Sequence, residues 1–514
     1  MKRVAPVLVA AVIALAYVLV SPPSGDLPAH LFRAWLFSKD PFGIWNNLWY
    51  SGHHIVGYSL LYPAASAALT PQLAAALAAT ASAAVFELLA YRRFGEDAWL
   101  GAVLFAAATA TDLFAGRLAF AFGALPALCA VLALDRGRTL TAAALALLSA
   151  LCSPVAALFA ALAGAAHALA TRRPAGALVA AAALAPVGVI ALVFPEGGTE
   201  PFASSAFWPL LFVCAGALVA LPRKATALRT GVALYALAAI ASYLIATPLG
   251  SNAARLGTLL AAPLAALVLW PRRAVWLAIA LAPLLYIEWQ APVRDLVIAS
   301  GDRSTSSGYY KPLLDFLGRQ TGAPFRVEIP FTRFHWEAYA VASHYPLARG
   351  WERQLDIKDN PLFYSGRLTP ASYEAWLQRT AVRFVAAPDA QLDYSAMAER
   401  RLIDDGLPYL RLVARTTHWR IYAVKDATPI AQGSARLMAL GPESVTLFAP
   451  SAGVTLLHVH FNPYWALAGG FGCVSPAGEN TVVTLQRGGE VKLVVSFGLS
   501  RIRARSPRCT PGPR

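Results

Sequence analysis

Residues 154–194 read PVAALFAALAGAAHALATRRPAGALVAAAALAPVGVIALVF. Two apolar runs, each long enough to cross a hydrocarbon core of about 30 Å as an α-helix, flank the basic pair Arg172-Arg173. The same arrangement recurs through the first 289 residues, and only 14% of the whole chain is charged, against roughly 25% in soluble proteins. This pattern predicts a polytopic α-helical membrane protein.

The apolar runs predict about eleven transmembrane helices. We expect them at residues 4–20, 71–90, 98–112, 117–134, 139–152, 154–171, 176–194, 204–221, 226–246, 254–270 and 274–288. The first run follows a basic start and could be a cleavable signal peptide. We expect a retained span, because the run reaches Val20 without a small-x-small cleavage site. The mostly apolar residues 55–69 are interpreted as a re-entrant or surface segment.

The net charge of +15 does not indicate nucleic-acid binding, because the basic residues lie between apolar runs. They occupy alternate connections: Lys2-Arg3, Arg92-Arg93, Arg136 with Arg138, Arg172-Arg173, Arg223-Lys224 and Arg272-Arg273. The intervening connections contain few Lys or Arg residues. Under the positive-inside rule, the N-terminus is cytoplasmic and everything after about residue 290 lies beyond the plasma membrane.

The first connection is predicted to be a large outer loop, residues 21–70. Long loops that belong to a compact fold are frequent carriers of function. Asp26 followed by Pro28 is a helix-start signal. At helical spacing Asp26, His30 and Arg33 share one face, as expected for a helix that lies on the outer membrane surface.

The remaining chain predicts extracytoplasmic domains after a transmembrane domain of residues 1–289. In residues 290–430 helical and strand-like stretches alternate, which favours a small α/β domain. In residues 431–500 short alternating runs are separated by Gly and Pro, which is typical of a β-sandwich-like domain. The Pro- and Arg-rich residues 501–514 are expected to form a disordered tail.

The five cysteines divide between the two regions. Cys129, Cys152 and Cys214 lie in apolar spans, where packing is the simplest role. Cys473 and Cys509 are the only two cysteines in the extracytoplasmic part, an oxidising setting, so we predict a disulfide between them. Two free thiols are the alternative.

Ionisable residues gather at the expected outer ends of the spans rather than at mid-membrane. These residues are Asp112, Arg117, Arg255 and Glu288. Ion-coupled transporters place such groups near the membrane centre, so the pattern argues against the first alternative function, a lipid or glycan transporter. It favours a site at the outer boundary and a lipid-level substrate.

The residues of the first loop resemble a known signature. They are Gly25-Asp26-Leu-Pro-Ala-His30, then Trp45, Trp49-Tyr50-x-Gly52 and Tyr62-Pro63. This pattern resembles that of GT-C-type glycosyltransferases and of bacterial YfhO-type membrane proteins. The segment Asn462-Pro-Tyr-Trp-Ala-Leu-Ala-Gly-Gly470 is similar to the β-rich end of the second group. The resemblance covers the outline of the whole chain.

The resemblance implies a GT-C-like membrane glycosyltransferase. Its donor would be a polyprenyl-phosphate-linked sugar, its acceptor a cell-envelope glycan or lipid, and its chemistry an inverting hexosyl or pentosyl transfer. Asp26 would be the general base that takes the acceptor proton, with a helix N-cap as the alternative role. Arg117 and Arg255 are candidates for the donor phosphate, since guanidinium is a permanently charged, bidentate clamp; snorkelling to the interface is their alternative.

Other polar residues are weaker candidates. His30 and Arg33 could orient Asp26 or contact a phosphate, although helices near lipid headgroups often carry such residues without a further role. His53 and His54 are included as candidate substrate contacts. Together with Asp26 and His30 they suggest a divalent metal, but adjacent histidines on a strand do not readily face one ion, so we predict no cofactor.

Two charged, aromatic segments of the α/β region remain open to two interpretations. They are His335-Trp-Glu337 and Arg349-Gly-Trp-Glu-Arg-Gln354. Such residues suit sugar stacking and hydrogen bonding, but a buried salt-bridge network is the simpler interpretation. A catalytically silent relative that serves as an envelope assembly factor is the second alternative function, because fold does not fix function.

Overall fold

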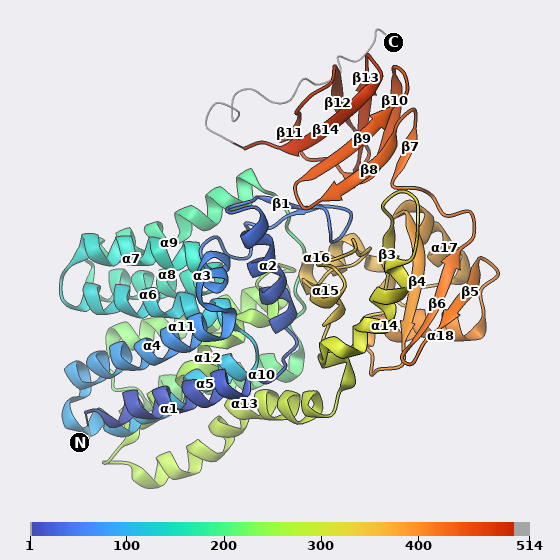
Figure 1. Cartoon of the computed structure of the whole chain (residues 1–514). Helices are drawn as coiled ribbons and strands as arrows, with labels where there is room; N and C mark the ends of the chain where they lie inside the picture. Colours follow the sequence, from blue (N-terminus) through green and yellow to red (C-terminus); the bar gives the residue numbers. More distant parts are fainter. Residues whose placement is uncertain (1–2, 498–514) are drawn as a thin grey trace. The chain divides into compact units, whose positions relative to one another are not determined.

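The computed structural model describes residues 3–497 and divides into two compact units (Figure 1). We call residues 3–34 and 57–301 the helical unit, and residues 35–56 and 302–497 the C-terminal unit. This division differs from the expected boundary at residue 289. The middle of the first connection belongs to the C-terminal unit, and the last long helix continues to Ser300.

A helix coincides with each range in which a span is expected. The helices are α1 (Ala5–Val20), α4 (Pro71–Phe94), α5 (Trp99–Phe114), α6 (Leu118–Asp135), α7 (Thr139–Cys152), α8 (Pro154–Thr171), α9 (Pro174–Val193), α10 (Ser204–Ala220), α11 (Thr226–Leu244), α12 (Arg255–Leu269) and α13 (Ala274–Ser300). Within residues 3–497, seven helical segments are long and apolar enough to cross a membrane, one of them being Pro71–Phe114, and α1, α7 and α10 are shorter apolar helices. The membrane-type helical half is confirmed, whereas the count of about eleven spans stays a prediction.

The helical unit carries large apolar side chains on its outside and small residues within. Leu192, Phe212 and Val219 are 84%, 73% and 86% exposed. At the contact of α8 with α9, a Cβ on Gly164 would lie 2.6 Å from the carbonyl oxygen of Gly176. Close backbone approach through small residues and an apolar exterior are the properties expected of helices packed in lipid.

The first connection forms two short helices, α2 (Leu27–Lys39) and α3 (Tyr62–Leu69), and a small antiparallel pair, β1 (Trp45–Asn46) with β2 (His53–His54). Helix α2 begins directly after Asp26, as the helix-start signal predicts. Helix α3 falls within residues 55–69. It has 8 residues, hence a length of about 12 Å, which is too short to cross a bilayer.

The α/β part of the C-terminal unit contains one four-stranded sheet in the order β3-β4-β6-β5. Its strands are β3 (Arg326–Glu328), β4 (Val382–Pro388), β5 (Leu410–Arg415) and β6 (Trp419–Val424), and only β3 and β4 pair in parallel. The helices are α14 (Ser307–Gly318), α15 (Glu337–Ala340), α16 (Arg353–Asp359), α17 (Pro370–Arg379) and α18 (Met397–Asp405). Tyr373 and Trp376 of α17 pack on Val385 of β4 in its core.

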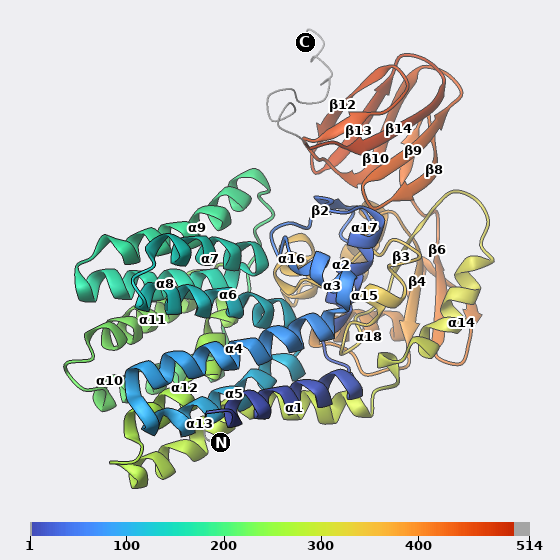
Figure 2. The same ribbon diagram turned by 60° about the vertical axis from the view of Figure 1, so that its left-hand side comes forward.

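The β-rich part contains two antiparallel four-stranded sheets, in the orders β12-β13-β10-β7 and β11-β14-β9-β8. Strands β8, β9, β10, β12, β13 and β14 are labelled in Figure 2. The strands are β7 (Ala431–Gly433), β8 (Arg436–Gly441), β9 (Ser444–Ala449), β10 (Gly453–His460), β11 (Trp465–Leu467), β12 (Gly472–Ala477), β13 (Asn480–Leu485) and β14 (Gly489–Val495). Alternate residues such as Val445 and Leu447 of β9 are buried. The predicted C-terminal β-sheet domain is confirmed.

The predicted disulfide cannot be followed in the described residues. Cys473 lies on β12, whereas Cys509 and the expected tail, residues 501–514, lie outside residues 3–497. Cys129, Cys152 and Cys214 are free thiols. The pairing of Cys473 with Cys509 stays a prediction.

Residues 35–56 join the two parts of the C-terminal unit. Backbone hydrogen bonds link Leu48 O to Leu347 N at 2.8 Å and Ser51 O to His460 N at 2.7 Å. Trp49 is 1% exposed, and a Cβ on Gly350 would lie 2.4 Å from its Cγ atom. The aromatic residues of the first connection therefore form core of the C-terminal unit, which composition alone did not predict.

Candidate functional site

Polar residues converge at one end of the helical unit. Asp26 precedes α2, Asp112 lies in the last turn of α5, Arg117 directly precedes α6 and Arg255 is the first residue of α12. These positions belong to helix ends and to the turns between them. These four ionisable groups thus lie where the chain enters or leaves a helix.

Arg117 is the centre of this group. It interacts electrostatically with Asp26, Asp112, Arg255 and Asp295. The Arg117 Nη1 to Asp112 Oδ1 distance is 3.7 Å, longer than a hydrogen bond. Arg117 thus lies within electrostatic range of the predicted residues Asp26 and Arg255, and of the carboxylates of Asp112 and Asp295.

The turn that carries Arg117 depends on a glycine. Gly116 has φ +76°, and a Cβ there would lie 2.3 Å from Ser24 Oγ and 3.3 Å from Asp26 Cβ. The Nε2 atom of His30 donates a hydrogen bond to Gly116 O at 3.0 Å. The close approach and this hydrogen bond set the start of α2, and with it Asp26, beside the Arg117 turn.

His30 is a structural part of this site rather than a cation. It is 1% exposed and lies edge-on against Tyr62, with ring centroids 5.3 Å apart. Burial first, then the neighbouring Arg33 and Arg255, lowers the pKa of His30 to about 3. The ring is neutral at physiological pH, so His30 is suited to positioning and not to pairing with a phosphate.

Arg33 and Arg255 are held against aromatic rings. The guanidinium of Arg33 lies 3.9 Å from the ring centroid of Tyr58, and that of Arg255 lies 5.7 Å from the centroid of Phe120. Arg33 is 3% exposed. Such cation–π contacts hold a guanidinium group against the face of a ring.

Several buried polar atoms of the site make no hydrogen bond within residues 3–497. They are Ser24 Oγ, His30 Nδ1, Asp112 Oδ1 and Arg255 Nε. Most buried polar atoms in folded proteins have a hydrogen-bond partner, so a cluster of exceptions requires an explanation. Unused donors and acceptors beside a partly exposed carboxylate, Asp26, are what a site for a polar ligand provides.

Asp26 is compatible with both roles inferred from the sequence, a general base and a helix N-cap. It occupies the N-cap position before Leu27, and its carbonyl oxygen accepts the first helical hydrogen bond from His30 N at 3.3 Å. It also lies within electrostatic range of Arg117. A carboxylate at an N-cap position and near an arginine can serve as a base as well.

His53 and His54 belong to the other unit. In the C-terminal unit the His53 ring stacks on Trp49 at 6.1 Å between centroids, and the His54 ring lies edge-on to Trp45 at 4.7 Å. Both histidines are buried. Their contacts are those of core packing. No group of three or more His, Cys, Asp or Glu side chains in the described part of the chain could hold a metal ion.

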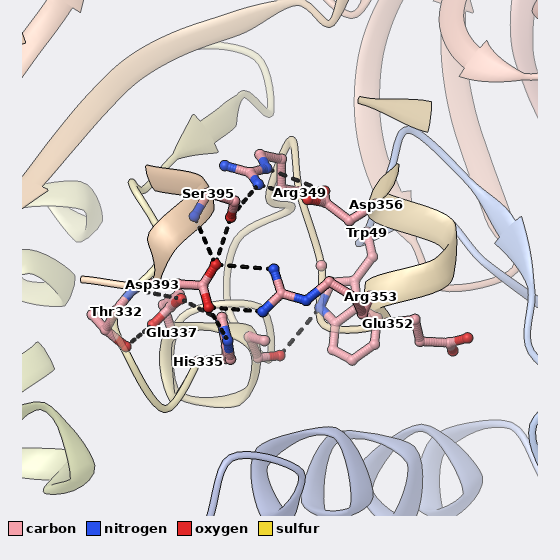
Figure 3. Close-up of polar contacts among 12 residues, drawn as sticks. Trp49, Thr332, His335, Glu337, Arg349, Glu352, Arg353, Asp356, Asp393 and Ser395 are labelled. Atoms are coloured by element: carbon pink, nitrogen blue, oxygen red, sulfur yellow. Dashed lines mark hydrogen bonds and ion pairs between the residues drawn. The ribbon is translucent and has the colours of Figure 1, made fainter. Parts of the chain in front are cut away.

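The charged segments of the α/β part form a buried salt-bridge network, which confirms the simpler interpretation (Figure 3). Arg349 donates to both oxygens of Asp356, at 3.1 and 2.6 Å, and Nη1 lies 3.5 Å from Glu399. Burial raises the pKa of Glu399 to about 7. Burial, then the nearby Glu399, raises the pKa of Glu328 well above its usual range.

A second arginine pair lies next to the first (Figure 3). Arg353 donates to both oxygens of Asp393, at 2.9 and 2.7 Å, and the ring of His335 stacks on Trp351 at 3.3 Å. Burial alone would raise the pKa of Asp393, but the hydrogen bonds from Arg353 hold it below its usual range. Burial lowers the pKa of His335 well below its usual value. These groups stabilise one another inside the domain.

Comparisons with known proteins add no assignment. No protein-family model matches the chain, and no curated protein matches it. The case for a function is therefore made from the geometry of the residues.

Proposed function

We propose that the protein is a GT-C-like membrane glycosyltransferase that uses a polyprenyl-phosphate-linked sugar. The observation that carries this proposal is the cluster of Asp26, Arg117 and Arg255 at one end of an apolar helical bundle. A carboxylate beside two guanidinium groups combines a base for an acceptor hydroxyl with a binding site for a phosphate. Both features are needed for sugar transfer from a phosphate donor.

The chemistry follows from the charges of the cluster. Asp26 takes the proton of an acceptor hydroxyl while that oxygen bonds to the anomeric carbon of the donor sugar. The bond from that carbon to the phosphate oxygen breaks, and the electron pair leaves with the polyprenyl phosphate. The leaving phosphate gains one negative charge, so Arg117 and Arg255 bind it more tightly during the reaction than before it.

The surroundings of the cluster suit a lipid-borne donor. The helices around it have apolar exteriors, and the site lies at helix ends rather than mid-helix. A polyprenyl chain can remain in lipid while its phosphate reaches Arg117. We place this site on the outer face of the plasma membrane, with a cytoplasmic N-terminus, on the basis of the basic connections.

Cysteine labelling tests that orientation. In intact cells, Arg172→Cys and Arg223→Cys should resist a membrane-impermeant thiol reagent, and both should react once the cells are opened. Labelling of either residue from outside would show that the predicted number of spans is wrong, and labelling of both would favour the opposite orientation, with Asp26 on the cytoplasmic face.

Mass spectrometry of envelope glycans tests the activity. Cells that lack the protein should lose one sugar from an envelope glycan or glycolipid, and the wild-type protein should restore it. Arg117→Gln should fail to restore it, whereas Arg138→Gln, which changes an exposed arginine between α6 and α7, should succeed. An unchanged glycan profile after removal of the protein, or full restoration by Arg117→Gln, would contradict the proposal.

A further inference from the structure

A pocket of about 130 Å³ lies wholly within the C-terminal unit. Three segments that are distant in sequence line it: Tyr50 and Ser51 of the first connection, residues of the α/β part that include Asp359 and Arg379, and residues of the β-rich part that include His460 and Glu479. Sites formed where separate parts of a protein meet are common places for ligands. This pocket is unrelated to the Asp26 cluster, which belongs to the helical unit.

The wall made by the first connection is strained and firmly held. Tyr50 and Ser51 have φ values of +55° and +62°, and Gly52 follows at +115°. The Tyr50 hydroxyl donates to Gly350 O at 2.5 Å and accepts from Glu352 N at 2.9 Å. Left-handed backbone at non-glycine residues costs about 1–3 kcal/mol each and persists where surrounding contacts impose it, frequently at ligand sites.

The opposite walls are fixed as well. The Nδ1 atom of His460 donates to Gly52 O at 2.9 Å. Asn360, also in the lining, donates to Asp356 at 3.0 Å and accepts from Trp376 at 2.8 Å, which ties the pocket to the buried salt-bridge network. A pocket whose walls are already ordered loses little entropy when a ligand binds.

The charge of the pocket region is balanced. Arg379 lines the pocket, and the fully buried Arg326 donates to the backbone oxygen of Thr380 in the lining. The lining also contains two carboxylates, Asp359 and Glu479. A phosphate would meet these carboxylates and a cation would meet Arg379, so the mixed charges favour a neutral ligand with many hydrogen-bonding groups.

We propose that this pocket binds one sugar ring of a neutral glycan. The lining supplies both donors and acceptors, as the hydroxyl groups of a sugar require, beside apolar surface of the kind that a sugar ring also presents. A volume of about 130 Å³ is well below the roughly 300–1,000 Å³ of pockets for drug-sized ligands, which limits the occupant to a single ring. The proposal stands whether or not the helical unit transfers sugars.

Saturation-transfer NMR with the full-length protein in lipid nanodiscs tests this site. The probes are glucose, N-acetylglucosamine and arabinose, each at about 10 mM, since single sugars bind with millimolar affinity when contacts are few. At least one should receive saturation on its ring protons. Glu479→Ala, which removes a charged hydrogen-bonding group, should weaken that binding about tenfold or more.

Glu490→Ala is the matched control, because Glu490 is an exposed carboxylate on β14 of the same β-rich part and outside the pocket. It should leave sugar binding unchanged. Should Glu479→Ala lower the melting temperature, Asp359→Asn replaces it and should weaken binding similarly. The proposal is overturned if none of the three sugars binds, if both glutamate variants bind alike, or if inorganic phosphate displaces the bound sugar.

Discussion

Both units contain a cluster of arginine and carboxylate side chains, but the two clusters differ in how deeply the arginine is buried and how closely it is paired. In the C-terminal unit Arg349 is 1% exposed and makes two short hydrogen bonds to Asp356. In the helical unit the side chain of Arg117 is 28% exposed and Asp112 stays 3.7 Å away. Both clusters contain buried polar atoms without a hydrogen-bond partner in the described residues, Glu328 Oε1 and Arg349 Nη1 in the C-terminal unit among them. What distinguishes the helical cluster is the partly exposed side chain of Arg117, which a ligand can reach.

Burial of charged side chains alone is therefore a poor indicator of a functional site. Burial raises the pKa of Glu328 and lowers that of His335 in the C-terminal network, yet the arginines of this network pair with carboxylates of the same domain. The helical cluster lies at the ends of apolar helices. Accessibility to a ligand is the better criterion, and it can be tested by substitution.

The largest expected effect is on the stability of the buried salt-bridge network of the C-terminal unit. Asp356→Asn keeps the shape of the side chain but leaves Arg349 buried without its main partner, so the C-terminal unit should lose about 3–5 kcal/mol. Hydrogen exchange of the β4 amides in the full-length protein measures this loss.

Asp315→Asn is the control for that substitution. Its partner Lys311 is 73% exposed and Asp315 is 51% exposed, so the change should cost no more than about 0.5 kcal/mol. Equal losses of stability in the two variants would show that the buried network stabilises the C-terminal unit no more than a surface ion pair does.

The next effect concerns the cluster around Arg117 in the helical unit. Gly116→Ala should lower sugar transfer about a hundredfold, because the new Cβ displaces Ser24 and Asp26 relative to Arg117. Gly137→Ala is matched to it: Gly137 has a similar φ of +73°, but its Cβ would meet nothing within 4 Å. Both variants carry a similar backbone strain, so turnover at equal folded protein isolates the displacement. Equal turnover by the two variants would mean that this turn does not align the site.

The smallest expected effect is a pH dependence of the folding stability that the buried salt-bridge network of the C-terminal unit provides. Burial raises the pKa of Glu337 to about 8, so its stabilising contribution is complete below its unfolded pKa and is lost as pH rises toward 8. The lowered pKa of His335 acts in the opposite direction but only below about pH 6.5. Between pH 6.5 and 8 stability should therefore fall, with Glu337 contributing up to about 1.4 kcal/mol per pH unit.

Melting curves over that pH range check the prediction. Glu337→Gln should flatten the slope, and part of it should remain because Glu399 also has a raised pKa. Glu374→Gln, an exposed glutamate on α17, should leave the slope unchanged. A slope that Glu337→Gln does not alter would assign the pH dependence to other groups.

Local signals explain how well the helices could be predicted. The boundary between α7 and α8 follows from Ser153-Pro154, because Ser153 Oγ accepts from Ala156 N at 3.4 Å and proline suits the first helical position. The end of α13 was missed: expected at residue 288, it lies at Ser300. Polar residues beyond Glu288 indicate an exit from lipid, but they do not end a helix.

The candidate site was predictable only in part, because the sequence indicates the membrane face of a residue but not its long-range contacts. Asp26, Arg117 and Arg255 could be grouped because the alternation of basic connections assigns them to one membrane face. Asp295 was not found, since it lies beyond the expected end of α13. The placement of His53 and His54 inside the C-terminal unit depends on long-range packing around Trp49, for which a single sequence carries no signal.

The most direct test of the account is the turnover of a polyprenyl-phosphate sugar by Asp26→Asn at equal folded protein. Asparagine caps a helix about as well as aspartate but cannot take up the acceptor proton. If Asp26 is the general base, turnover should fall about a hundredfold or more, with donor binding retained. Turnover near that of the wild type would contradict this assignment, and would leave Asp26 as the cap of α2.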